Sequence, residues 1–307
     1  MNVTALAGGV GGAKLLVGLA RALAGTGRLT AVVNTGDDSV IYGLHVSPDV
    51  DIVTYWLAGV ADFERGWGIQ GDTFRVVDAL AELGAESWFR LGDADMATCL
   101  YRTDRLRSGA SLSIVTDDIR RRLDVDARVL PMSDDPVRTM IECEDGRTLE
   151  FQEWFVRERC EPAVAQVRFG GLADAKPAPG VIEAIEHADL VVLCPSNPIV
   201  SIGPIVSLPG VRHALRQHRR VVAVSPLIDG LPLKGPADKL LRAAGEEISA
   251  AGVAAMYADF CDTFVIDAAD STAEDEITAR GTRCVKLDTV MTTHDVSERL
   301  ARSISSL

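Results

Sequence analysis

Residues that could bind a phosphate lie in a glycine-rich segment near the N-terminus. Gly8 to Lys14 reads Gly-Gly-Val-Gly-Gly-Ala-Lys and separates an apolar run at 3–7 from apolar residues at helical spacing up to Leu23. Backbone N–H groups and the helix dipole favour an anion at such a junction. The segment matches neither the dinucleotide fingerprint, which needs glycine at Lys14, nor the Walker loop, which needs Ser or Thr at Leu15. We expect a phosphate contact here, with close helix packing as the alternative, from Gly9, Val10, Gly11, Gly12 and Lys14.

Small polar residues follow the next apolar run, at 29–33. They are Asn34, Asp37, Asp38, Asp49 and Asp51, and they lie where open α/β sheets bind ligands. Carboxylates repel a phosphate unless a hard cation lies between them, and Mg²⁺ prefers one or two carboxylates plus phosphate oxygens. The cluster therefore predicts a magnesium cofactor. The alternative makes Asp37 and Asp38 turn residues and Ser47 the cap of a helix.

Neutral polar residues follow two later apolar runs. Ser196 and Asn197 stand in Pro-Ser-Asn-Pro after the run 188–194, Ser201 comes shortly after them, and Ser225 follows the run 220–224. These side chains could donate hydrogen bonds to a nucleotide or a phosphate. Proline-rich connections from strand to helix are also common without any ligand.

A parallel sheet is needed to bring these segments together. The strand, glycine turn, helix and strand at 3–33 form a βαβ unit, and the buried runs at 188–194 and 220–224 are flanked by helical patterns. Residues 139–144 and 147–156 alternate around Asp145-Gly146, which predicts an antiparallel hairpin. We expect an α/β fold with a doubly wound, mainly parallel, Rossmann-like sheet. It forms a single domain over 1–307 with an antiparallel insertion at about 135–170.

Composition excludes several classes of protein. The 307 residues are 47% hydrophobic and carry a net charge of −13, which predicts a folded chain that does not bind nucleic acid. The six cysteines are dispersed, which favours reduced thiols over disulfides or a zinc site. No apolar run reaches membrane-spanning length, so a cytoplasmic protein is expected, and a symmetric homodimer is the default assembly.

Longer motifs resemble a known family, the 2-phospho-L-lactate transferases of deazaflavin coenzyme factor 420 biosynthesis. The resemblance spans most of the chain. It rests on the glycine segment, the acidic turn Val33–Asp38, Ser47–Asp51, Gly66–Gly68, Leu91–Asp93, Leu130–Asp135, Phe151–Trp154, Pro195–Pro198, Ser201–Ile205 and Val224–Pro226.

The resemblance implies transfer of a phospholactyl, phosphoenolpyruvyl or phosphoglyceryl group. The donor is a guanosine diphosphate derivative of the acid, the acceptor is the ribityl hydroxyl of the deazaflavin alcohol 7,8-didemethyl-8-hydroxy-5-deazariboflavin, and GMP is released with magnesium present. By the same resemblance Asp37 and Asp49 are metal ligands, Asp37 and Asp51 are catalytic, and Asp51 contacts the deazaflavin. There its carboxylate could orient the acceptor or accept the hydroxyl proton. Phosphoryl transfer needs mainly positioning and charge neutralisation, which these residues provide.

The chain departs from the family pattern at two positions. Ala94 and Cys99 stand where the family usually has arginine and histidine. Arg90 and Arg102 are the neighbouring arginines that could compensate for this departure, and we count Arg90 among the substrate-binding residues.

Two other functions compete with this interpretation. A non-catalytic, nucleotide-sugar-binding regulator of a related group shares the glycine segment, but such proteins usually have Asp-Asp-Gly-Gly-Ser-Ser-Gly where this chain continues Ser39-Val40. An NAD-dependent dehydrogenase needs an acid where Asn34 stands.

Overall fold

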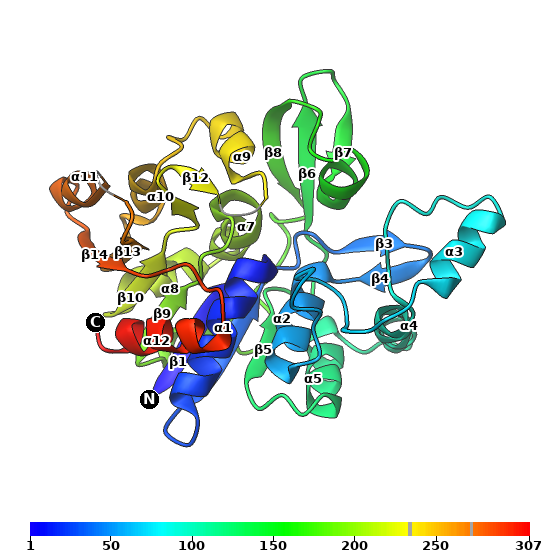
Figure 1. Ribbon diagram of the computed structural model, residues 1–307, viewed down its shortest axis with the longest axis horizontal. Coiled ribbons are helices and arrows are strands. Elements are labelled where there is room, and N and C mark those ends of the chain that lie inside the picture. The colour runs from blue at the N-terminus through cyan, green and yellow to red at the C-terminus, as the bar shows by residue number, and fades with distance from the viewer. Residues whose placement is uncertain (233–234, 271–272) are drawn as a thin grey trace.

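Seven parallel strands form the central sheet of the computed structural model, which describes residues 1–232, 235–270 and 273–307 (Figure 1). Their order is β14-β13-β10-β9-β1-β2-β5, and each neighbouring pair is parallel. The bounds are β1 Asn2–Ala7, β2 Arg28–Val33, β5 Arg128–Pro131, β9 Leu190–Leu193, β10 Val221–Val224, β13 Thr263–Asp267 and β14 Arg283–Leu287. This is the doubly wound order, so the predicted fold class is confirmed. The chain reverses its direction of winding between β1 and β9.

Helices cover both faces of this sheet because its strands are apolar on both sides. Alternate residues of one strand, such as Ala5 and Leu6 of β1, enter different cores. One core contains α1 (Gly9–Leu23), α2 (Pro48–Ala58) and α12 (His294–Ser305), and the other contains α6 (Val181–Glu186), α8 (Val211–Gln217) and α10 (Ala250–Tyr257).

The predicted antiparallel region is a three-stranded sheet of order β7-β6-β8. Its strands are β6 (Arg138–Cys143), β7 (Thr148–Glu150) and β8 (Val164–Gly170), at the top of Figure 1. The predicted second strand was too long, since β7 ends at Glu150 and the chain continues as a helix that includes η1 (Glu153–Arg157). The helical turn buries Trp154 completely, and a continued strand cannot place Phe151 and Trp154 on one face.

A separate group of elements projects to the right in Figure 1. It contains β3 (Ser39–Ile41), β4 (Leu44–Val46), α3 (Arg75–Glu82) and α4 (Asp93–Arg107), and we call it the arm. The arm has a small apolar core of its own, which includes Ile41, Val77 and Cys99. Helix α5 (Leu112–Arg122) connects the arm to the sheet by packing against α4 and β5.

The remaining elements are short. They are η2 (Pro198–Ile202), α7 (Gly203–Ser207), β11 (Leu227–Ile228), β12 (Leu231–Pro232), α9 (Ala237–Ala243) and α11 (Ala273–Ala279). Within the described ranges, no helix combines the length and the apolar character that crossing a membrane requires.

Candidate active site

A cavity of about 680 Å³ opens at the carboxyl ends of the central strands. Gly8 to Gly11 follow β1, Asp37 follows β2, Pro195 and Ser196 follow β9, and Ser225 follows β10; all of them line it. The cavity therefore occupies the point where the winding reverses, the usual ligand site of this architecture.

The glycine segment is the first turn of α1 and not a loop before it. Glycine is required by close packing, since a Cβ on Gly8 would lie 2.4 Å from Asp49 Oδ2 and one on Gly11 would lie 2.5 Å from the Pro195 carbonyl oxygen. Gly12 does not line the cavity, and a Cβ there would lie 2.7 Å from Ser196 Oγ. The packing alternative thus explains these three glycines.

The start of α1 nevertheless presents donors to the cavity. The N–H of Gly9 donates to Asp49 Oδ1 at 2.8 Å, while the first-turn N–H groups of Val10 and Gly11, which line the cavity, have no intrahelical acceptor. No acidic residue stands in this first turn. Lys14 lines the cavity one turn later, and its Nζ donates to the Met291 carbonyl at 3.0 Å. This end of the cavity can accept an anion.

Asp37 and Asp49 are buried carboxylates that line the same cavity. Asp37 Oδ1 has no hydrogen-bond partner among the described residues. Burial and the charge of Asp49 raise the pKa of Asp37 well above its usual range, and burial raises the pKa of Asp49 to about 6. Two buried acids that repel each other, one with an orphaned oxygen, are a donor set suited to a hard divalent cation.

Neighbouring polar groups fix the orientation of the acids in this cluster. Asn34 is fully buried, lies outside the cavity lining, and donates its amide to Asp49 Oδ2 at 2.9 Å, so it positions a carboxylate. Asp38 is directed elsewhere: it accepts a 2.7 Å hydrogen bond from Ser47 Oγ and pairs with His45 at 2.9 Å. The alternative correctly placed Asp37 in a turn and began a helix after Ser47. The capping role of Ser47 was wrong, because its hydroxyl makes no cap hydrogen bond.

Asp51 lines the cavity from α2 and is held by an arginine. Both of its carboxylate oxygens accept hydrogen bonds from the Arg102 guanidinium on α4, Oδ2 at 3.0 Å from Nη1 and Oδ1 at closer range from Nη2. Burial raises the pKa of Asp51 although Arg102 opposes the shift. Arg102 has no exposed surface, so it cannot compensate for Ala94 and Cys99 by binding substrate.

The polar loops after β9 and β10 also line the cavity, but most of their side chains bind backbone. Ser196 Oγ donates to the Gly8 carbonyl at 2.7 Å, Asn197 Oδ1 caps η2, and Ser225 Oγ donates to the Leu227 carbonyl at 2.9 Å. Ser201 packs against Gly8. The structure brings all four to one edge, where they shape the wall.

Aromatic and cationic residues that the sequence did not single out as a group also line the cavity. They are Arg65, Trp67, Phe89, Arg90, Phe151 and Phe155. The Arg65 guanidinium lies 5.0 Å from the ring centroid of Trp67, and the Trp67 side chain is 38% exposed. Arg90, which was predicted to bind substrate, lines the cavity and is paired with Asp78 at 2.6 Å.

Three further lining features escaped the sequence analysis. Tyr55 and Asp95 enter from α2 and α4, and 289–292 follows β14. For Tyr55 the only available signal was its position four residues after Asp51, which places both side chains on one face of a helix.

Comparisons with known proteins agree with this architecture. A model of the family described as 2-phospho-L-lactate transferase CofD matches residues 3–304. A 2-phospho-L-lactate transferase of Methanosarcina acetivorans is 43% identical over 302 residues, covering 98% of this chain and 97% of the relative. A phosphoenolpyruvate transferase of Streptomyces griseus is 42% identical over 313 residues, covering 100% and 98%.

Solved structures support the fold alone. A Bacillus halodurans protein superposes with a TM-score of 0.66 at 18% identity, covering 99% of each chain. The family model and the curated relatives span nearly the whole sequence, and so this chain belongs to the 2-phospho-L-lactate transferase CofD family and is an enzyme of the transferase class.

Proposed function

We propose that this enzyme transfers a phospho-acid group from a guanosine diphosphate-linked donor to the ribityl hydroxyl of the deazaflavin alcohol and releases GMP, in coenzyme factor 420 biosynthesis. The observation that carries the proposal is the position of Asp37 and Asp49 beside the start of α1, in one cavity at the reversal point of a family fold. This arrangement suits a diphosphate at the start of α1, beside carboxylates that would hold magnesium.

The start of α1 and the aromatic lining residues suit the two substrates. Val10, Gly11 and Lys14 supply N–H groups and a positive charge for the donor diphosphate. Trp67, Phe151 and the other aromatic residues supply an apolar surface for a planar ring system. Magnesium held by Asp37 and Asp49 would neutralise phosphate charge as it develops during transfer.

The reaction needs one bond to form and one to break. The acceptor hydroxyl oxygen bonds to the phosphorus that carries the acid, the bond from this phosphorus to the bridging oxygen breaks, and GMP departs with that oxygen. The hydroxyl proton must pass to a base. The chain needs no covalent intermediate for this step.

A product assay identifies the acid that the enzyme transfers. Relatives named for phospholactate and for phosphoenolpyruvate are 43% and 42% identical to this chain, so overall identity does not separate them. Incubating the protein with the deazaflavin alcohol, magnesium and each guanylylated acid in turn should give one product mass above all others. Absence of every product mass would disprove the proposed transfer.

We also expect selective stabilisation by ligands. GDP with magnesium should raise the melting temperature, because a ligand that binds only the native state adds RT ln(1 + [L]/Kd) to its stability. NADH and UDP-N-acetylglucosamine should cause no shift in the same thermal-melting series. A shift with the UDP-sugar and none with GDP would favour the regulator.

A further inference from the structure

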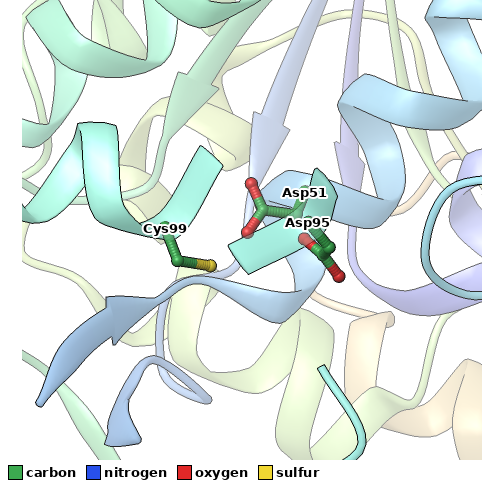
Figure 2. Close-up of side chains that lie close together, drawn as sticks. All are labelled: Asp51, Asp95 and Cys99. Carbon is green, nitrogen blue, oxygen red and sulfur yellow. The ribbon is translucent and has the colours of Figure 1, made fainter. Parts of the chain in front are cut away.

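Three buried side chains meet at the end of the cavity nearest the arm. Asp51, Asp95 and Cys99 each place one ligand-type atom within 4.8 Å of the others (Figure 2). Arg102 already binds both oxygens of Asp51, and burial raises the pKa of the Cys99 thiol, which therefore stays protonated. A cation here would be repelled by the guanidinium, so the group is not a metal site.

Asp51 and Asp95 differ in how their charges are compensated. Asp51 has a fixed, buried cation on both oxygens. Within the described part of the chain Asp95 forms no ion pair, and its Oδ1 accepts a 2.8 Å hydrogen bond from the neutral Tyr55 hydroxyl. A carboxylate neutralised by a guanidinium is a poor proton acceptor, whereas one that holds a single neutral hydrogen bond keeps its basicity.

The surroundings of Asp95 suit a base that works near neutral pH. It lines the cavity with only 9% of its surface exposed. Burial and the neighbouring charge of Asp51 raise the pKa of Asp95 to about 7, while the Tyr55 hydrogen bond and Arg102 lower it; Asp72 raises it slightly. The most effective base has a pKa close to the working pH.

We propose that Asp95 is the catalytic base that takes the proton from the attacking hydroxyl of the acceptor. The oxygen–hydrogen bond breaks, its electron pair forms the new bond to phosphorus, and the proton moves to Asp95 Oδ2. Asp51, fixed by Arg102, orients the acceptor, and Tyr55 is the positioning residue that holds Asp95 through Oδ1. This inference rests on the proposed transfer.

The decisive variant is Asp95→Asn, with the pH dependence of kcat as the readout. In the unmodified enzyme kcat should fall as pH drops through about 7, since only the ionised carboxylate accepts a proton. Asp95→Asn should lower kcat by about 10²-fold or more, leave KM for the acceptor nearly unchanged and abolish that limb. Asp104→Asn is the matched control, because Asp104 is an exposed acid on the same helix and lies outside the cavity lining. This variant should keep the original kcat and the acidic limb of the pH profile.

A second variant tests the same group without removing it. Tyr55→Phe deletes the hydrogen bond that lowers the pKa of Asp95, so the acidic limb should move to higher pH. The other facing groups, Asp51, Asp72, Cys99 and Arg102, stay in place. If the acidic limb of the kcat profile persists in Asp95→Asn, or does not move to higher pH in Tyr55→Phe, Asp95 is not the base. The proposed transferase function would still stand. An unmodified enzyme that transfers nothing would overturn both.

Discussion

Replacing Asp37 by asparagine is expected to abolish magnesium-dependent turnover and, in the same protein, to stabilise the metal-free fold. The Asp37 carboxylate is buried and repels Asp49, and one of its oxygens finds no hydrogen-bond partner in the described ranges, so its charge is costly until a cation binds. Asparagine keeps its shape without its charge. We expect turnover to fall by about 10³-fold or more, since metal charge stabilisation is worth several kcal/mol. Urea unfolding without magnesium should show a gain of about 1–2 kcal/mol.

The neighbouring acid provides the control. Asp38 is adjacent in sequence but binds His45 and Ser47 and does not line the cavity. Asp38→Asn should therefore keep turnover within about three-fold, a change of less than 1 kcal/mol in the barrier. Asp49→Asn should lose turnover as Asp37→Asn does. Equal losses at Asp37 and Asp38, or an Asp37→Asn protein less stable than the original, would contradict the metal assignment.

The pH dependence of stability gives an independent check. Burial raises the pKa of Asp49 from 3.8 to about 6, so between those pH values the folded chain binds more protons than the unfolded chain. The stability of the metal-free protein should consequently fall as pH rises through that range. The stabilisation by magnesium should grow over the same range, because the ion must displace the proton. A magnesium effect independent of pH would contradict the assignment of Asp49.

Patterns of apolar residues along the sequence predicted much of the fold, because apolar residues are the ones that become buried. The continuous apolar runs at 188–194 and 220–224 became β9 and β10, which are buried on both faces. The predicted strand at 147–156 was wrong beyond Glu150. Apolar and polar residues alternate up to Glu150, and the chain then runs directly into a helix in which apolar residues are three apart. Periodicity over so few residues cannot separate the two.

The sequence predicted the site residues that follow a strand of the sheet, but it missed those that a tertiary contact brings to the cavity. Asp37, Asp49 and Asp51 lie near the end of one strand, so sheet geometry alone placed them at the ligand edge. Asp95 lines the cavity, and Arg102 supports Asp51 from behind, only because α4 of the arm lies against α2 through these side chains. Such a tertiary contact leaves no local pattern. Asn34 was predicted at the ligand edge, but it lies outside the cavity lining and supports Asp49 from behind, because its amide faces that carboxylate.

The second large effect is expected where the arm meets α2. Arg102 on α4 has no exposed surface, binds both oxygens of Asp51 and donates to the His45 carbonyl of β4 at 3.3 Å. Arg102→Met should lower the free energy of unfolding by about 3–5 kcal/mol, because a buried carboxylate is left without its cation. Asp95 lies within 4.8 Å of that carboxylate and would add like-charge repulsion.

The pair can be separated from the packing around it by a double-mutant cycle. Asp51→Leu alone leaves the Arg102 charge buried and unpaired, so it should be destabilising to a similar extent. Combining Asp51→Leu with Arg102→Met removes both charges and should recover most of the loss, giving a coupling energy of about 2–3 kcal/mol in urea unfolding. Additive losses would mean that each side chain stabilises the arm through its own packing. Coupling without recovered turnover is the expected result, because Asp51 lines the cavity and its carboxylate is needed there whether or not the arm is held in place.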